Sequence, residues 1–240
     1  SGHNQLRRLL LAHYVPRLNG RAVLPPVSHT SAYVHFFDAV ARKTGRNPLE
    51  IIPQLEEPDV RGKRGLPSIN DSLNAVTLDN QLDFIRNMPA AGVEVYWMDA
   101  GWFKGEWPNG VGNWEAKQPA FPSGLKALGD AAHQRGLKFL LWFEPERVGK
   151  DSTIAREHPE WLIQTPVMVG SQPSFSLDLG NPGARKWITE LLSSRIVGWG
   201  IDVFRNDRNA CPLPVWRAAD AADGCGAPDR RSHRPTTPIR

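Results

Sequence analysis

Apolar runs that end abruptly in charged or amide side chains recur three times along the chain. The runs are residues 93–102 (VEVYWMDAGW), 138–146 (KFLLWFEPE) and 201–207 (IDVFRND). Each has the length and the continuous apolar character of a strand that is buried on both faces. Parallel strands bring their carboxyl ends to the same edge of a sheet, so acidic side chains at these ends indicate one shared pocket.

Segments with a helical spacing of apolar residues separate the predicted strands. Helices are predicted over residues 78–88, 123–136 and 182–198. Thr77 and Asn181 stand where helix caps are expected, and Pro182 suits the first turn of the third helix. The alternation of helix and strand predicts an α/β fold with a parallel sheet and right-handed crossovers.

The predicted sheet is closer to a (β/α)8 barrel than to a doubly wound sheet. Carboxylates end several strands, and neither a GxGxxG nor a GxxxxGK[ST] loop occurs. The 240 residues approach the length of a complete barrel, about 250 residues. However, only four or five strands are predicted before Asp207, so we expect only the N-terminal part of a TIM barrel.

The two ends of the chain differ from this middle part. Residues 1–21 predict a short amphipathic helix and a turn, and residues 22–33 predict a first strand that Pro25 and Pro26 introduce. Prolines punctuate residues 38–70, which predicts a loop that includes the charged run 56–64. Residues 217–240 contain one Ile and no Leu, Val, Phe or Trp. This composition predicts a disordered tail or a shifted reading frame.

Asp207 is the first candidate for chemistry. It ends an apolar strand, follows Arg205 and stands two residues before Asn209. A carboxylate nucleophile must be ionised at neutral pH, and a nearby guanidinium and amide donors favour that state. The pattern supports equally well an Asp207 that caps a turn or that pairs with Arg205 or Arg208.

A sugar is the substrate class that the second acidic strand end favours. Asp99 can accept hydrogen bonds from two substrate hydroxyls, or it can form a turn at the strand end. Trp102 follows it closely, and Trp114 lies in a Gly-Asn-Trp loop. Indole faces beside carboxylates suit sugars, because the C–H faces stack on the rings and the hydroxyls pair with the acids.

Glu144 and Glu146 flank Pro145 at the third strand end. We expect one of them to point into the pocket and the other to pair with Arg147 or another neighbour, and we name Glu144 as the residue that binds substrate. Asp178 follows a further apolar piece and is more typical of a turn.

Composition excludes several classes of function. The net charge of +4 comes from scattered residues and forms no basic stripe, so no nucleic-acid partner is expected. The histidines show no metal-ligand spacing, and Cys211 and Cys225 form no CxxC pair, so we expect no metal, no cofactor and two unpaired thiols. No apolar run approaches the ~20 residues of a membrane span, and none suits a signal peptide. A cytoplasmic location without membrane partners follows as an expectation, and a homo-oligomer is compatible with the sequence.

Six segments together resemble the catalytic domain of glycoside hydrolase family 36, the melibiase-type α-galactosidases of clan D. They are VYWMDAGWF, GNWEAKQPAFPSGLKAL, GLKFLLWFEPERV, REHPEWLI, LDLGNP and IDVFRNDRN, in this order across residues 70 to 216. The resemblance implies a (β/α)8 barrel over residues 22–216 that hydrolyses terminal α-galactosides with retention. It makes Asp207 the nucleophile, Asp99 a ligand of galactose hydroxyls and Trp114 a lining residue. Arg205 would stand where the family usually has Lys, and we expect Arg205, Asn209 and Trp102 to bind substrate as well.

The chain departs from the family pattern in four places. Ala100 replaces a second Asp, which weakens the assignment of galactose in particular. Arg205, Asn206 and Asp207 replace the usual Lys-Trp-Asp. Residues 1–21 resemble only the linker from the family's N-terminal β-sandwich, and the acid/base Asp of a later strand is absent from the chain. We therefore expect the chain alone to be poorly active or inactive.

Two other functions stay open. One is a related α-glycoside activity, such as an α-N-acetylgalactosaminidase or a transglycosylase. The other is a carbohydrate-binding remnant without catalysis.

Overall fold

The computed structural model describes residues 2–14, 17–18, 20–22, 26–47, 50, 69–169, 172–209 and 211–222. The helices are α1 (Gly2–His13), α2 (Ser31–Thr44), α5 (Ile69–Asn74), α6 (Leu78–Asn87), α7 (Lys126–His133), α8 (Thr153–Glu157), α9 (Pro182–Trp199) and α10 (Leu213–Ala222), with the 3-10 turns Pro89–Ala91 and Pro159–Trp161. The strands are β1 (Arg17–Leu18), β2 (Arg21–Ala22), β3 (Ser28–Thr30), β4 (Val95–Met98), β5 (Lys138–Phe143), β6 (Arg147–Gly149), β7 (Leu162–Val169), β8 (Gln172–Leu177) and β9 (Val203–Asn206).

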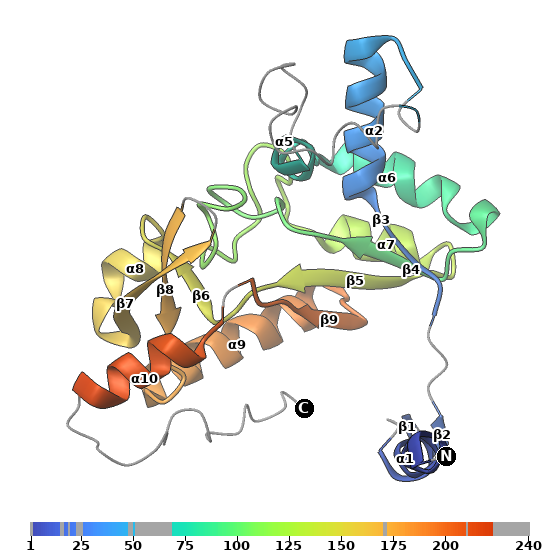
Figure 1. The fold of residues 1–240 in the computed structure, drawn as a ribbon. Helices are drawn as coiled ribbons and strands as arrows, with labels where there is room; N and C mark the ends of the chain where they lie inside the picture. Colours follow the sequence, from blue (N-terminus) through green and yellow to red (C-terminus); the bar gives the residue numbers. More distant parts are fainter. Residues whose placement is uncertain are drawn as a thin grey trace.

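A parallel sheet of the four strands β3, β4, β5 and β9 organises the chain (Figure 1). The strands stand in the order of the sequence, and each pairs in parallel with the next. Helices α6, α7 and α9 lie in the connections between successive strands of this sheet, as expected for crossovers between parallel strands. The prediction of an α/β fold with a parallel sheet is confirmed. The described residues contain four strands of this sheet, and they do not form a closed eight-stranded barrel.

One face of this sheet is covered by helices. Tyr96 and Phe139 are fully buried and stack with ring centroids 5.4 Å apart, and Tyr96 also contacts Phe84 of α6. Alternate residues of a strand point to opposite faces. Trp97 and Leu140 therefore lie on the other face, where both are only partly buried.

Local sequence explains where the helices begin and end. Thr77 caps α6 in a capping box with Asn80, in which each side chain accepts from the backbone N–H of the other. The Asn181 side chain accepts from the N–H groups of Gly183 and Ala184 at the start of α9. Gly200 ends α9 in the left-handed region at φ 68°. The caps predicted from the sequence at Thr77 and Asn181 are confirmed.

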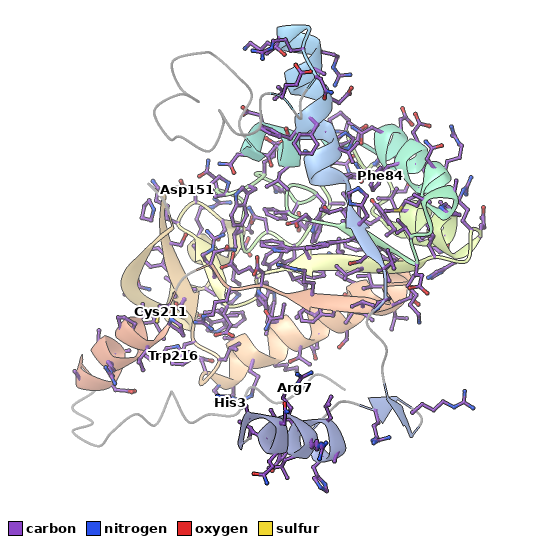
Figure 2. The ribbon with its side chains drawn as sticks, turned by 45° about the vertical axis from the view of Figure 1, so that its right-hand side comes forward. His3, Arg7, Phe84, Asp151, Cys211 and Trp216 are labelled. Atoms are coloured by element: carbon purple, nitrogen blue, oxygen red, sulfur yellow. The ribbon has the colours of Figure 1, made fainter. Side chains whose placement is uncertain are left out.

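A second, antiparallel sheet lies beyond the carboxyl end of β5. Its strand order is β6-β8-β7, and a loop containing Trp107 and Trp114 lies between β4 and α7. The apolar residues before Asp178 belong to β8 of this antiparallel sheet, so they do not form a strand of the parallel sheet. Helix α1 and the β1–β2 hairpin stand apart from both sheets (Figures 1 and 2), and no residue of α1 is buried. No described helix is both long and apolar enough to cross a bilayer.

Three predicted boundaries are wrong. The first strand is shorter than residues 22–33, because α2 begins at Ser31 and continues to Thr44 into the predicted loop. The predicted tail begins too early, because α10 continues six residues past Trp216 and buries Asp220. Four alanines between residues 218 and 222 favour this helix despite the scarcity of large apolar side chains. The charged run 56–64 and residues 223–240 lie outside the described residues.

Candidate functional site

The carboxyl ends of three neighbouring strands form the candidate site. Asp99 follows β4, Glu144 follows β5 and Asp207 follows β9, and these strands are adjacent in the sheet. The register pairs Trp142 with Arg205, which places Asp207 beside the end of β5. The prediction that the three strands deliver their acidic ends to one edge is confirmed.

Contacts from two strands hold the Asp207 carboxylate. Its backbone N–H donates to the Phe143 carbonyl at 2.8 Å, so the residue continues the ladder between β9 and β5. Trp142 Nε1 donates to Oδ2 at 2.8 Å, and Asn209 Nδ2 donates to the same oxygen at 3.2 Å. Arg205 Nη1 lies 3.1 Å from this oxygen as well. The side-chain contacts described here thus converge on Oδ2.

The Asp207 carboxyl is held in its ionised form. Burial acts to raise the pKa of Asp207, but the Trp142 hydrogen bond and the Arg205 guanidinium outweigh burial and set the pKa below its ordinary value. A carboxylate that is ionised at neutral pH and only partly buried can act as a nucleophile.

Arg205 lies over the ring of Trp97, with its guanidinium carbon 4.9 Å from the ring centroid. Cation–π contact and the ion pair with Asp207 together fix the guanidinium on the open face of the sheet. Arg205 Nη1 and Trp97 Nε1 are buried atoms without a hydrogen-bond acceptor among the described residues. Arg205 Nη1 is nevertheless ion-paired with Asp207, so Trp97 Nε1 is the donor of the two that stays without a partner in the described part of the chain.

Asp99 ends β4 in a tight turn. Its Oδ1 accepts the Ala100 N–H at 2.7 Å, and Gly101 continues the turn at φ 97°. A Cβ at Gly101 would lie 2.1 Å from the Leu73 carbonyl oxygen, so only glycine fits there. Burial raises the pKa of Asp99, and the negative charge of Asp207 adds to this rise, against the Ala100 N–H and Arg205. The hydrogen bond from the Ala100 N–H confirms one of the two alternatives predicted for Asp99, a turn at the strand end.

Glu144 is the glutamate that pairs with Arg147. Only 1% of Glu144 is exposed, and its Oε2 accepts from Arg147 Nε at 2.8 Å and from Nη2 at 2.7 Å. Its Oε1 accepts the backbone N–H of Asn209 at 2.7 Å. Protein donors occupy both oxygens, which contradicts the prediction that Glu144 binds substrate directly.

Glu146 has the more open position. It forms an ion pair with Arg208 and lines a small pocket with residues of β6, of β8 and of the segment before α10. Cys211 is an exposed free thiol in the lining of this pocket. Asp178 accepts the N–H of Gly180 at 2.9 Å, which confirms the turn predicted there.

The prediction that Trp102 and Trp114 contact a sugar is wrong for this structure. Trp102 is 0% exposed and Trp114 is 1% exposed. The Trp102 indole N–H donates to the Trp142 carbonyl at 3.1 Å, and both rings pack against Phe143. Both residues belong to the core, because the loop after β4 folds back over the end of the sheet.

Sequence reasoning missed two residues that shape the site. They are Trp97 and Trp142. Trp142 stands two residues before Glu144, and this spacing was the one signal that put it near the strand end. No signal in the sequence distinguished Trp97 from an ordinary core tryptophan. Among the described residues, no group of three His, Cys, Asp or Glu side chains could hold a metal ion.

Comparisons with known proteins agree with the resemblance seen in the sequence. A family model described as Melibiase matches residues 63–215. α-Galactosidase Mel36A of Lactobacillus acidophilus is 32% identical over 142 residues, which are 56% of this chain and 19% of that protein. α-Galactosidase 1 of Pediococcus pentosaceus is 34% identical over 125 residues, 49% of this chain and 17% of that protein. The chain thus spans about a fifth of the length of these relatives.

Solved structures show the same similarity. An α-galactosidase from Lactobacillus brevis matches with a TM-score of 0.52 and 29% identity over 60% of this chain and 19% of that chain. A variant of the family 36 α-galactosidase AgaA from Geobacillus stearothermophilus, solved in complex with raffinose, matches with a TM-score of 0.52 and 26% identity over 57% of this chain and 20% of that chain. The family model covers more than half of the sequence, and the named relatives agree with it, so this chain belongs to the melibiase family.

Proposed function

We propose that this chain carries the nucleophile side of an active site that hydrolyses terminal α-galactosides with retention. The observation that carries the proposal is the Asp207 carboxylate, which stands at the end of β9 with its Oδ2 held by Trp142 and Asn209. The four parallel strands in sequential order are consistent with the N-terminal part of a (β/α)8 barrel. The named relatives, which are α-galactosidases, support the substrate class.

The first half of the reaction follows from these contacts. An oxygen of Asp207 attacks the anomeric carbon, the bond from this carbon to the leaving oxygen breaks, and a glycosyl ester of Asp207 forms. Oδ2 is occupied by protein donors, so Oδ1 is the oxygen that we assign to the attack. Water then cleaves the ester and restores the carboxylate. A second carboxyl group about 5–5.5 Å away must first protonate the leaving oxygen and later activate the water.

The described residues supply parts of a sugar subsite around this nucleophile. The unpartnered Trp97 Nε1 and the Arg205 guanidinium can donate to acceptor oxygens such as sugar hydroxyls. We assign Asp99 as a further acceptor, because its carboxyl group follows β4 at the same edge of the sheet. Glu144 does not qualify as the acid/base, because Arg147 and Asn209 occupy its oxygens. We therefore expect this chain alone to form the glycosyl ester with an activated substrate but to turn over unactivated α-galactosides poorly.

Covalent labelling tests this proposal without an acid catalyst. An α-galactosyl fluoride with a second, rate-slowing fluorine needs no protonation of its leaving group. Intact-protein mass spectrometry is expected to show one added fluorosugar, and peptide mapping is expected to place it on Asp207. The variant Asp207→Asn should remain unlabelled. Asp202→Asn, a matched change at the opposite end of β9, should label normally.

Labelling of another residue, or equal labelling of Asp207→Asn, would contradict the assignment of the nucleophile. A separate assay of melibiose hydrolysis, an unactivated α-galactoside, tests the low turnover. Turnover near that of a complete relative would refute the expected inactivity of the chain alone.

A carbohydrate-binding function without catalysis is the second candidate. Ala100 favours it, because a methyl group stands where an acid would help to select the sugar, and this residue is only 3% exposed. Isothermal titration with galactose and melibiose distinguishes the two functions. Binding without covalent labelling of Asp207 supports the binding function.

A further inference from the structure

A buried ion pair lies next to the candidate nucleophile and is not itself a contact for a substrate. Glu144 and Arg147 have side chains that are 1% and 4% exposed, and they are three residues apart. Arg147 is held from two further sides. Its guanidinium carbon lies 4.7 Å from the centroid of the Trp107 ring, and its Nη1 lies 3.5 Å from Ser174 Oγ of β8.

The carboxylate of this pair reaches the loop that follows Asp207. Glu144 Oε1 accepts the Asn209 backbone N–H at 2.7 Å, and Glu144 Oε2 accepts Asn209 Nδ2 at 3.2 Å. Asn209 Nδ2 also donates to Asp207 Oδ2 at 3.2 Å. One buried residue at the end of β5 thus fixes both the backbone and the side chain of an exposed residue, and that side chain contacts the nucleophile.

We propose that Glu144, held by Arg147, is a positioning residue that orients the Asp207 carboxylate through Asn209. Arg147 neutralises Glu144, so a buried carboxylate can stand close to the ionised Asp207. Charge-assisted bonds to Asn209 are stronger than bonds between neutral groups, which suits them to fix an exposed loop. This role rests on the proposed function of Asp207 as the nucleophile, but the contacts of Asn209 can be tested without it.

The alternative is a purely structural ion pair that joins β5 to β6. Replacing a buried ion pair with apolar side chains of similar volume often leaves stability unchanged or increases it. The double variant Glu144→Leu with Arg147→Met therefore separates the two roles. It removes the bonds to Asn209 and leaves no unpaired buried charge. Arg147→Lys is an intermediate variant, because it keeps a cation beside Glu144 but loses the paired Nε and Nη2 donors.

Three measurements on the 240-residue chain test the proposal. Amide hydrogen exchange by NMR should be about tenfold or more faster at Asn209 in the double variant, because a charge-assisted bond is lost. The carboxyl-carbon titration of Asp207 should shift to higher pH, since an anchored donor to Oδ2 is lost. Labelling by the activated fluorosugar should slow about tenfold. Arg147→Lys should give values between those of the unchanged chain and those of the double variant. A control double variant, Lys126→Gln with Asp130→Asn, removes an exposed ion pair and should change none of them.

Unchanged exchange at Asn209 together with an unchanged titration of Asp207 in the folded double variant would overturn the proposal. If the double variant does not fold, Glu144→Gln replaces it. Its amide nitrogen would face the donors of Arg147 and Asn209, so faster exchange at Asn209 is again expected, and unchanged exchange again refutes the role. Absence of labelling in the unchanged chain would refute the proposed function alone, and the exchange and titration results would then still decide the role of Glu144.

Discussion

Replacing Trp102 with Phe tests whether this tryptophan is a core residue or a sugar platform. Trp102 is 0% exposed, and its indole N–H donates to the Trp142 carbonyl at 3.1 Å. Its ring contacts, with centroid distances in parentheses, are Phe143 (5.2 Å), Phe103 (5.5 Å), Trp199 (5.5 Å) and Trp114 (6.1 Å). The variant keeps one aromatic ring and loses the second ring and the N–H donor.

The expected cost follows from these two losses. A lost intramolecular hydrogen bond costs about 1 kcal/mol. The missing ring removes roughly 40 Å² of buried apolar surface, which corresponds to about 1 kcal/mol at ~25 cal/mol per Å². We expect the free energy of unfolding to fall by about 2 kcal/mol, which lowers the midpoint of thermal unfolding by roughly 4–8 °C for a chain of this size.

Urea unfolding followed by circular dichroism measures this cost, and isothermal titration with melibiose measures sugar binding. Trp97→Phe is the matched control for the stability measurement, because Trp97 is partly exposed and its Nε1 has no hydrogen-bond acceptor among the described residues. The control should lose no more than about 1 kcal/mol, the worth of its contact with Arg205. A Trp102→Phe variant that keeps its stability within ~0.5 kcal/mol but loses sugar affinity would refute the core assignment.

Two further predictions concern packing and pH. Gly129→Ala should lower the free energy of unfolding by about 1–3 kcal/mol, because its Cβ would lie 2.2 Å from the Trp199 carbonyl oxygen. Gly198→Ala is the control: a Cβ there meets no atom within 4 Å, so this change should stabilise α9 by about 0.5–1 kcal/mol. Equal effects of the two changes in urea unfolding would contradict this packing. Burial acts to raise the pKa of Asp202, but its bonds to the Phe139 N–H and to His133 outweigh burial and lower the pKa. The resulting stability is present above the ordinary pKa of 3.8 and is lost as the pH falls through the lowered value. Asp202→Asn should therefore flatten the pH dependence of unfolding below about pH 4, and an unchanged acid limb would refute this linkage.

Local patterns were sufficient for the order of the main elements. The runs at 93–102, 138–146 and 201–207 became β4, β5 and β9, and the caps at Thr77 and Asn181 start α6 and α9. The helix α2 and the end of α10 were not predicted. Prolines and alanines near these segments dominated the pattern, and helix formation there depends on packing as well as on propensity.

The site was predicted less completely than the fold. Asp207 and Arg205 lie together as expected, with Asn209 beside them, because strand ends and short spacings are local features. Glu144 could not be separated from Glu146 by sequence, because both flank one proline. The choice between them depends on Arg147 and on the loop after Asp207, which β6 and β9 bring to the same place.

The sequence by itself determined which strands end in acids, since a continuous apolar run followed by a carboxylate needs no distant partner to be recognised. Only the tertiary structure decided what faces the open edge of the sheet. Trp102 and Trp114 follow an acidic strand end, as a sugar platform would, yet the loop that contains them folds over β5 and buries them. Trp97 lies inside a strand, yet it supports Arg205 on the open face. The physical reason is that burial of a side chain depends on which distant segments pack against it, and periodicity along one segment carries no information about those segments.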